Sequence, residues 1–471
     1  MAKPNILLLM TDQQRWDAMS CSGDWVQTPN MDRIASEGVR FQNCVTNSPV
    51  CIPTRLSLAT GLYPHNTGIW DNLHYDMAPG SPTWMQKVRE AGYRTSVFGK
   101  THLHRHQGGD LRDREPLMRS LGIDDIDEIG GPRASTRIGS YLTERWKSRG
   151  LWEAYQEDYR DRYATSPHVV RPSVLPLEEY ADVYVGQQSK KYLENYTREE
   201  PWMCWISFGG PHEPWDTPEP YASRYDPKAM PKPAQFSKNP SDRPRGRMDT
   251  LLESAPRPSE EESAAMRANY AGNISLIDDQ IGEILDTIEA RGELENTIIV
   301  FCSDHGEFNG DYGLVYKHAF LDGAVRVPLI IRTPETLKRP GGQVSDALVE
   351  WFDIGPTLVE LVGSAVDSSQ FGKSLVPVLA VPTETHRDFA ISELQGEIMI
   401  LTERWKMLLN ESGEPYYLFD RQEDPGESIN RVRDETTLAV QQELKLKILE
   451  HLVRNQIQFG EDLPPYSVTS G

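Results

Sequence analysis

Short apolar runs alternate with longer amphipathic stretches along the first three quarters of the chain. Five runs are almost wholly apolar, as strands buried on both faces are; they cover residues 5–10, 94–98, 203–208, 297–302 and 327–331. Strands separated by helices in this way are typical of a parallel sheet. The pattern predicts an α/β fold with a large, mostly parallel mixed sheet flanked by helices.

The predicted helices carry start and stop signals. Residues 28–38 and 81–92 both open with a hydroxyl residue followed by proline, and both close on glycine. Proline suits the first helical position, and glycine suits the position after the last turn. Residues 260–288 are expected to form a long helix, because isoleucines recur there every three or four positions and would share one face.

Two segments lack a clear period. Residues 107–172 are charged and contain several glycines, and residues 213–260 hold many Pro, Asp and Arg residues. Long irregular segments in a compact domain are usually covers or insertions with a function. We therefore predict two irregular segments that shape a substrate site.

The pattern of apolar and polar residues changes after about residue 375. Short strand-like runs at 389–393, 399–402, 406–409 and 416–419 are joined by turns, which predicts a small antiparallel sheet. An amphipathic helix is expected over residues 436–457. The sequence thus predicts a large α/β domain over residues 1–375 and a small α+β subdomain over residues 376–471.

Charge and cysteine usage restrict the partners. The net charge of −21 argues against nucleic acid or an anionic membrane as a partner, and an anionic substrate would need positive charge gathered locally. No apolar run reaches membrane-spanning length. Five cysteines without paired spacing are typical of reduced thiols. Residues 5–10 favour a buried first strand over a secretory signal, so we predict a cytoplasmic protein.

The most specific motif lies at residues 51–61, which read Cys-Ile-Pro-Thr-Arg-Leu-Ser-Leu-Ala-Thr-Gly. This segment resembles the sulfatase signature, Cys-x-Pro-x-Arg followed by Thr-Gly. On it, the chain is identified as a member of the type I formylglycine-dependent sulfatase family, in the alkaline phosphatase superfamily. The plainer interpretation is a turn at Pro53 that leads into a helix, with Cys51 a small buried thiol.

The resemblance implies covalent catalysis at residue 51 in the domain over residues 1–375. Cys51 would become an aldehyde (3-oxoalanine, or formylglycine), which hydrates to a diol. One hydroxyl attacks sulfur, and loss of the other proton then releases sulfate. The resemblance also implies a maturation enzyme that reads Pro53 and Arg55, with Arg55 near the diol.

A divalent metal is implied by two further motifs at the ends of predicted strands. Asp12 and Gln13 resemble the first metal motif of the family, although its second position is more commonly acidic. Asp304 and His305 resemble the second. With the residue 51 diol they would bind one cation; we expect Ca²⁺, with Mg²⁺ and Mn²⁺ as alternatives.

Further residues resemble the sulfate-binding positions of the family. Lys100 and His102, in Gly-Lys-Thr-His-Leu, would clamp the sulfate, and His102 would take the proton in the second step. His212 and Lys317 would bind the sulfate and act on the leaving oxygen. Asn72 would face the substrate or the nucleophile.

Three histidines are less clear from the sequence. His104 and His106 follow the Lys100 motif, and we expect them in a solvated loop. His65 has two open interpretations, a supporting residue behind the site and a residue at a helix end.

Two other functions stay open. Phosphonate and phosphate-diester monoester hydrolases of the same superfamily share both metal motifs but typically have hydroxyl residues at the Lys-x-His segment. A non-catalytic protein could keep the fold, bind a sulfated ligand and leave Cys51 unmodified. We favour a sulfatase acting on a carbohydrate or aryl sulfate, and the helix at 436–457 could join two copies into a homo-oligomer.

Overall fold

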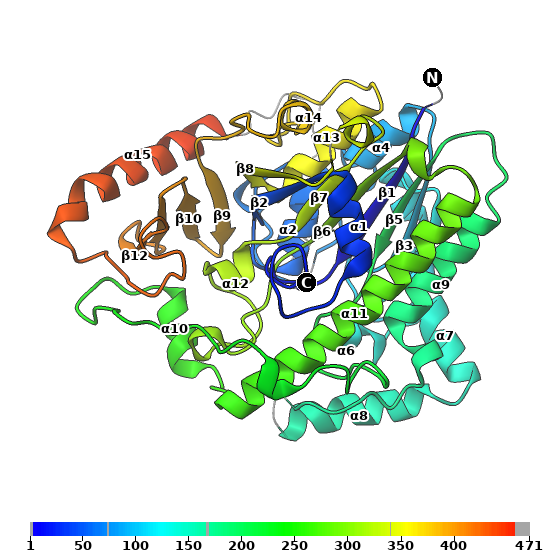
Figure 1. Ribbon diagram of the computed structural model, residues 1–471, viewed down its shortest axis with the longest axis horizontal. Coiled ribbons are helices and arrows are strands. Elements are labelled where there is room, and N and C mark those ends of the chain that lie inside the picture. Colours follow the sequence, from blue (N-terminus) through cyan, green and yellow to red (C-terminus); the bar gives the residue numbers. More distant parts are fainter. Residues whose placement is uncertain (1–2, 73–74, 166–168, 340, 457–471) are drawn as a thin grey trace.

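Strand β1 lies at the centre of an eight-stranded sheet in the computed structural model, which describes residues 3–72, 75–165, 169–339 and 341–456 (Figure 1). The strands of this sheet are β1 (Asn5–Thr11), β2 (Val39–Val45), β3 (Arg94–Gly99), β4 (Asp125–Glu128), β5 (Trp202–Ser207), β6 (Thr297–Ser303), β7 (Leu329–Arg332) and β8 (Gln343–Glu350). The five predicted strands are among them. Sequence patterning did not identify β2, β4 and β8.

The strand order is β4-β3-β5-β1-β6-β7-β2-β8. Only β7 runs antiparallel to its neighbours, β6 and β2, among the strands described. The predicted large, mostly parallel mixed sheet is therefore confirmed. Because the order reverses on either side of β1, the carboxyl end of β1 is where a site is expected in such a sheet.

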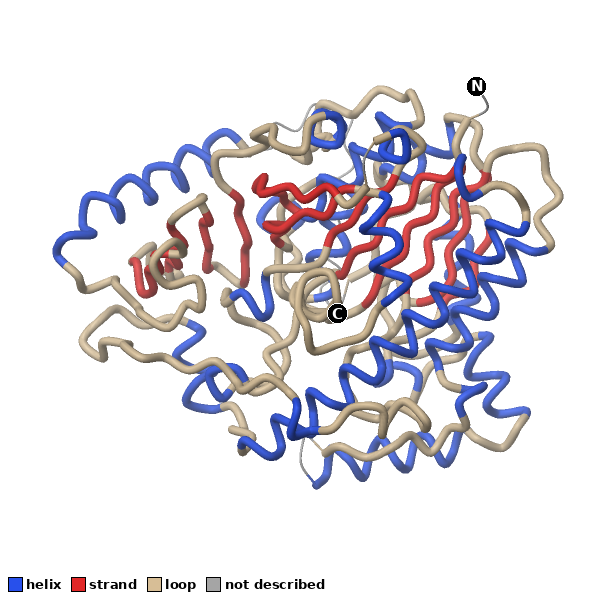
Figure 2. Tube along the Cα trace, in the orientation of Figure 1, coloured by secondary structure: helices blue, strands red, loops and turns tan. Residues whose placement is uncertain are grey.

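Helices cover both faces of the sheet (Figure 2). They are α1 (Pro29–Glu37), α2 (Cys51–Thr60), α3 (Pro64–Thr67), α4 (Trp84–Glu90), α5 (Glu115–Ser120), α6 (Pro132–Ser135), α7 (Tyr141–Ser148), α8 (Trp152–Thr165), α9 (Ala181–Glu194), α10 (Arg247–Ser254), α11 (Glu260–Ala290), α12 (Asp322–Val325), α13 (Ile354–Leu361), α14 (Val376–Ala380) and α15 (Leu438–Arg454). The three helices predicted from caps and isoleucine spacing correspond to α1, α4 and α11.

Alternate residues of the central strands supply two separate cores. On β1, Ile6 and Leu8 pack into the core that α2, α4 and α13 complete, whereas Leu7 and Leu9 pack into the core under α1, α9 and α11. This follows from the two-residue period of a strand, which sends successive side chains to opposite faces. The sheet is thus held rigidly from both sides.

A second, four-stranded antiparallel sheet lies beside the first, with α15 across it (Figure 1). Its strands are β9 (Ala390–Leu394), β10 (Glu397–Leu401), β11 (Trp405–Leu409) and β12 (Pro415–Asp420). The predicted small sheet is confirmed, and so is most of the predicted helix, of which residue 457 lies outside the described residues. The boundary between residues 375 and 376 stays a prediction.

The prediction of an irregular segment at 107–172 was wrong for most of its length, because α5, α6, α7 and α8 lie there. Charged residues hide the helical period on α8, which buries only part of one face. The segment 213–260 is irregular apart from α10 and a short turn. Among the described residues, none of the helices is both long and apolar enough to cross a membrane.

Candidate active site

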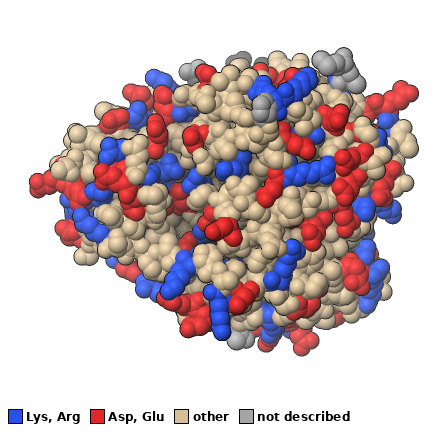
Figure 3. Space-filling model, in the orientation of Figure 1, with Lys and Arg blue, Asp and Glu red and all other residues tan. Residues whose placement is uncertain are grey.

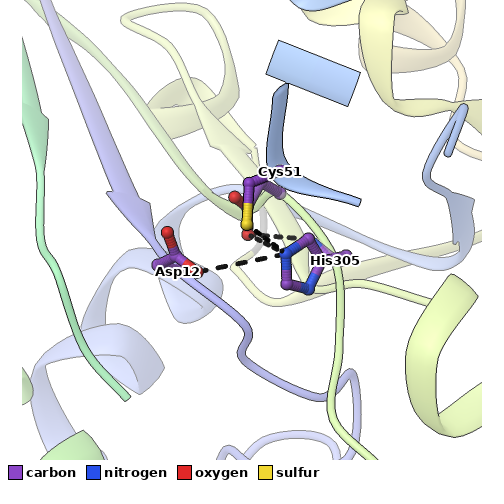
Figure 4. Close-up of side chains that lie close together, drawn as sticks. Asp12, Cys51 and His305 are labelled. Atoms are coloured by element: carbon purple, nitrogen blue, oxygen red, sulfur yellow. Dashed lines mark hydrogen bonds and ion pairs between the residues drawn. The ribbon is translucent and has the colours of Figure 1, made fainter. Parts of the chain in front are cut away.

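The carboxyl ends of the two central strands meet beside the start of α2 (Figure 4). Asp12 follows β1 directly, and Asp304 and His305 follow β6. Cys51 is the first residue of α2. Each of these four side chains offers a metal ligand atom, the atoms lie within 4.8 Å of one another, and all four residues are buried.

The geometry of His305 and Asp12 fits a divalent cation. His305 Nδ1 lies 3.0 Å from the carbonyl oxygen of Gly306 and donates to it, so in the neutral ring Nε2 has the lone pair that a metal ligand needs. Nε2 faces Cys51 Sγ at 3.0 Å and Asp12 Oδ1 at 4.0 Å. Asp12 Oδ1 is buried without a hydrogen-bond partner among the described residues, which is costly for a carboxylate oxygen unless a ligand fills the gap.

The structure brings Gln13 to the edge of this cluster. Its backbone is left-handed, with φ of 72°, and its N–H donates to Asp304 Oδ1 at 3.0 Å. Its amide oxygen accepts a hydrogen bond of 2.5 Å from Lys317 Nζ. Its amide nitrogen donates to Glu213 at 2.8 Å and also to Glu307. The amide of Gln13 is thus engaged between one cation and two carboxyl groups.

Cations surround the thiol of Cys51. Lys317 Nζ lies 3.6 Å from its sulfur. Burial raises the pKa of the thiol, but Lys317, Lys100 and His305 outweigh it and hold this pKa well below the usual value. The start of α2 adds the positive end of the helix dipole at the same place. The position therefore stabilises negative charge on residue 51 and on an anion bound to it.

Arg55 lies one turn along α2 and is fully buried. Its guanidinium donates to Asp12 at 3.0 Å, to Asp304 at 2.8 Å and to the carbonyl oxygen of Lys100 at 2.5 Å. It does not contact Cys51 through any hydrogen bond of the described residues. Arg55 therefore acts by fixing the two acidic side chains and by its field, rather than by direct contact with residue 51.

Lys100 and His102 reach the site from the end of β3. Gly99 has φ of 103°, and a Cβ there would collide with a carbonyl oxygen of β5. Lys100 Nζ donates to Asp12 Oδ2 at 2.5 Å. His102 lies beside Cys51, and burial together with Lys100 lowers the pKa of His102 well below its usual value. His102 is therefore neutral at pH 7 and able to accept a proton.

His104 and His106 are not solvated, which corrects the prediction. Both are buried and share the carboxylate of Glu128, with N–O distances of 2.7 and 3.2 Å. Thr101 donates to the same carboxylate. The rings of His106 and His102 meet edge to face, 4.7 Å apart. Glu128 lies at the end of β4, so no local pattern in the sequence could connect it to the two histidines.

His212 and Lys317 lie together on the side of the cluster that faces solvent. Lys317 Nζ is 2.9 Å from His212 Nε2, and His212 Nδ1 donates to the carbonyl oxygen of Glu213 at 2.7 Å. The Cys51 thiolate and Glu213 raise the pKa of Lys317 although burial opposes its charge. Lys317 is therefore charged, and a proton can pass between it and His212.

Asn72 and His65 have different surroundings. Asn72 Oδ1 accepts a hydrogen bond of 2.9 Å from the N–H of Ile52, so it lies at the start of α2 beside Cys51. His65 Nδ1 lies 2.7 Å from Glu393 Oε1 on β9. Of the two open interpretations, the structure favours the residue at a helix end, where His65 joins α3 to the small sheet.

Two carboxyl groups at the site received no role from the sequence. Glu213 and Glu307 both hold the amide of Gln13. Burial and then Glu213 raise the pKa of Glu307 to about 7. Their only sequence signal is position, because each follows a predicted motif within two residues.

Comparisons with known proteins agree with this arrangement. The model of the sulfatase family matches residues 4–364, and the model described as N-sulphoglucosamine sulphohydrolase, C-terminal, matches residues 310–454. An arylsulfatase of Clostridium perfringens is 30% identical over 449 residues, which cover 92% of this chain and 91% of that protein. An N-acetylglucosamine-6-O-sulfatase of Bacteroides thetaiotaomicron is 26% identical, covering 98% and 88%.

A solved structure with a similar fold is the phosphonate monoester hydrolase of Agrobacterium radiobacter. It aligns with a TM-score of 0.76 and 26% identity, and the alignment covers 96% of each chain. The two sheets and the match of the family model over residues 4–364 agree on one family. The chain belongs to the sulfatase family, within the alkaline phosphatase superfamily, and is an enzyme of the sulfuric ester hydrolase class.

Proposed function

We propose that this enzyme hydrolyses a sulfate monoester to an alcohol and inorganic sulfate, with residue 51 as the nucleophile. The observation that carries the proposal is the position of Cys51. Its side chain is buried at the start of α2, between Lys317 and His305 and against His102. A structural thiol needs none of these charged neighbours.

The nucleophile we propose is the hydrated aldehyde of formylglycine, made from Cys51 by a maturation enzyme. The sulfur atom of Cys51 marks where a hydroxyl of that hydrate would lie. The hydrate supplies both an attacking hydroxyl and a second hydroxyl whose loss of a proton frees the product. His102 lies beside this position and its pKa is lowered well below the usual value, so it is suited to accept that proton.

Asp12, Asp304, His305 and residue 51 would hold the cation, for which we propose Ca²⁺ with Mg²⁺ and Mn²⁺ as alternatives. Gln13 could join through its amide oxygen, which Lys317 holds. Such a cation supplies Lewis-acid chemistry, because it neutralises a bound anion and favours deprotonation of an attacking hydroxyl. Arg55 holds both acidic ligands in place through ion pairs of 3.0 Å to Asp12 and 2.8 Å to Asp304.

Lys100, Lys317 and His212 would bind the sulfate group. Lys317 and His212 share a contact of 2.9 Å on the solvent side, where the alcohol would leave. A protonated group at this pair can donate to the leaving oxygen. Asn72, by accepting the hydrogen bond from the N–H of Ile52, would position the nucleophile and face the substrate.

A phosphonate or phosphate-diester monoester hydrolase is the second candidate. The resemblance in fold to the Agrobacterium radiobacter enzyme and the neutral Gln13 in the first metal motif favour it. Lys100 and His102 favour the sulfatase, because they place a cation and a base on the sulfate side. The arylsulfatase and the N-acetylglucosamine-6-O-sulfatase named above favour a saccharide or aryl sulfate as substrate.

Two measurements test the proposal. The intact mass of the active protein should fall below that of the cysteine form by the difference between a thiol and an aldehyde. Rates for phenyl sulfate and for the phenyl monoester of a phosphonate, measured on the same preparation, should favour the sulfate. A large preference for the phosphonate would replace the proposal by its rival, and full activity of a protein that retains the thiol would exclude the formylglycine mechanism.

The remaining expectations stay proposals. The cytoplasmic location rests on the sequence alone. A homo-oligomer is supported by α15, on which Leu446 and Leu449 are more than half exposed. Lys and Arg are interspersed with Asp and Glu over the visible face in Figure 3, which suits neither nucleic acid nor an anionic membrane as a partner.

A further inference from the structure

The carboxylate of Glu128, at the end of β4, gathers three side chains from the loop that follows β3. Thr101 donates to Glu128 Oε1, His104 Nε2 donates to Oε2 at 2.7 Å, and His106 Nε2 lies 3.2 Å from Oε1. None of these four residues is more than 5% exposed. Because β3 and β4 pair in parallel and end together, the carboxylate lies directly against this loop. We call Glu128 with these three partners the Glu128 clamp.

The clamp is a hydrogen-bonded ion pair and not a second metal site. His104 Nδ1 lies 3.3 Å from the carbonyl oxygen of Arg105 and its Nε2 faces the Glu128 carboxylate, so both ring nitrogens donate and His104 is a cation without a lone pair for a metal. Burial raises the pKa of Glu128, but His104 and then His106 outweigh it and hold this pKa well below its usual value. One positive and one negative charge cancel, so the clamp acts through geometry rather than through its field.

The residue that this loop presents to the site is His102, and its conformation needs support. Its backbone is left-handed, with φ of 57°. Such a backbone is uncommon for a residue with a side chain and persists only where the surroundings hold it. The ring of His106 meets that of His102 edge to face, with 4.7 Å between their centroids. Nδ1 of both rings is buried without a hydrogen-bond partner among the described residues, so the contact between the rings is packing. Thr101 holds the chain on the preceding side of His102.

Lys100, at the start of the same loop, is held by other contacts. Its N–H donates to the carbonyl oxygen of Ser207 on β5 at 2.9 Å. Its own carbonyl oxygen accepts a hydrogen bond of 2.5 Å from Arg55. Neither contact involves the Glu128 clamp. A disturbance of the clamp should therefore displace His102 and leave the sulfate-binding lysine in place.

We propose that the Glu128 clamp positions His102 beside residue 51 for the second half of the reaction, the release of sulfate. This inference rests on the proposed function, in which His102 takes the proton of the second hydroxyl of residue 51. In that step the O–H bond breaks toward His102, a carbonyl group forms, and the C–O bond to sulfate breaks with its electron pair on the sulfate. The alcohol has already left, so its release does not depend on the clamp. Glu128 contacts none of the reacting atoms and is a positioning residue.

The test is Glu128→Gln, measured with phenyl sulfate on protein whose aldehyde is verified by mass. An amide places its NH₂ group against at least one of the three donors, so the clamp cannot close. We expect kcat to fall by about tenfold or more and KM to fall with it, so that kcat/KM stays within about threefold, because kcat/KM reports only the steps up to release of phenol. Rapid mixing should show a burst of about one phenol per enzyme ahead of sulfate release.

Three further variants separate position from stability. His106→Ala removes the ring that packs on His102 and should give the same kinetic pattern. His106→Phe restores a ring edge there and should recover most of the lost kcat, whether or not Glu128→Gln folds. The matched control is Glu179→Gln. Glu179 is a carboxyl group 1% exposed that binds Arg145 at 2.7 Å away from the site, so this variant should keep kcat and KM even if its melting temperature falls.

The kinetic pattern decides between the outcomes. A native kcat in Glu128→Gln and His106→Ala would overturn the inference and leave the proposed function intact. A lower kcat with unchanged KM and no phenol burst would also overturn it, because that pattern reports fewer active molecules and not a displaced base. Equal kcat in His106→Ala and His106→Phe would exclude the ring contact as the link to His102. A native enzyme with a verified aldehyde that does not hydrolyse phenyl sulfate would instead refute the proposed function, and this inference with it.

Discussion

Two of the buried charge clusters among the described residues have opposite characters. The catalytic cluster gathers Asp12, Arg55, Lys100, Asp304 and Lys317 around Cys51. The linking cluster joins β11 of the small sheet to α12: Lys406 Nζ donates to Asp322 at 2.7 Å and also to Glu427. Lys406 is fully buried there, as Arg55 is in the catalytic cluster.

The difference lies in how completely the polar atoms are paired. Lys406 meets two carboxyl groups, and Glu427 also accepts the backbone N–H of Asp322 at 2.8 Å. Lys406 lowers the pKa of Asp322 strongly against the effect of burial, and burial then raises that of Glu427 to about 7. In the catalytic cluster, Asp12 Oδ1 has no hydrogen-bond partner among the described residues. A closed cluster stabilises the fold, whereas an open one binds a ligand.

The largest expected effect comes from removing the nucleophile. Cys51→Ala should abolish sulfate ester hydrolysis, with a loss of about 10⁴-fold or more, because no other group can form the covalent intermediate. Cys204→Ala is the matched control, since Cys204 is a fully buried thiol on β5 and no described lysine, arginine or histidine shifts its pKa. It should keep its turnover while losing some stability. Comparable turnover in the two variants would remove residue 51 from the mechanism.

Chelation should have the next largest effect. Prolonged treatment with EDTA should lower kcat by about 10²-fold or more, because Asp12 and Asp304 then repel the sulfate instead of binding it through a cation. Readdition of Ca²⁺, Mg²⁺ or Mn²⁺ in separate samples identifies the ion that restores most activity. The linking cluster needs no ion, so the melting temperature should change less than the activity. Activity that persists in metal-free protein, verified by mass spectrometry, would contradict the proposed site.

The two clusters also differ in how far the sequence could predict them. Asp12 and Asp304 were placed correctly, because each follows an apolar strand and parallel strands end at one edge. The contact of Lys406 with Asp322 was beyond prediction, because 84 residues separate them and neither belongs to a motif. The contact between His104 and Glu128 was also beyond prediction, because it depends on β3 and β4 lying side by side in the sheet.

The missed strands have a common physical cause. Residues 39–45 and 343–350 form β2 and β8, near one edge of the sheet, where only one face of a strand needs to be apolar. Polar residues therefore interrupt both runs, for example Gln42 and Asp346, which hydrogen-bond to each other. The central strands lack such interruptions, and pattern alone identified them.

Equivalent changes at the two buried lysines should separate activity from stability. Lys406→Met leaves Asp322 and Glu427 without their cation, which should cost about 3–5 kcal/mol of unfolding free energy. Lys317→Met should instead leave stability within about 1 kcal/mol and lower kcat/KM by about 10²-fold. Urea unfolding and phenyl sulfate kinetics on both variants provide the comparison. A stability loss at Lys317 as large as that at Lys406 would show that the catalytic cluster is also structural.

The smallest effect concerns pH and the side of α15 that faces the large domain. Burial, together with His65 and Arg387, lowers the pKa of His451 to about 3. Because this pKa lies below that of the unfolded chain, the unfolded chain binds more protons between pH 3 and 6.5. The contribution of neutral His451 to the free energy of unfolding is therefore fully present above pH 6.5. It decreases by about 1.4 kcal/mol for each pH unit below 6.5.

His451→Phe keeps a ring against Tyr63, whose centroid lies 4.6 Å from that of His451, and removes the titrating group. Unfolding free energies of the native chain and the variant, measured from pH 7 to pH 5, should therefore diverge by the equivalent of one proton. The other buried histidines are common to both proteins and cancel in the difference. Parallel curves would mean that His451 is protonated alike in the folded and unfolded chains, so that the contact between α15 and the large domain does not exclude water from it.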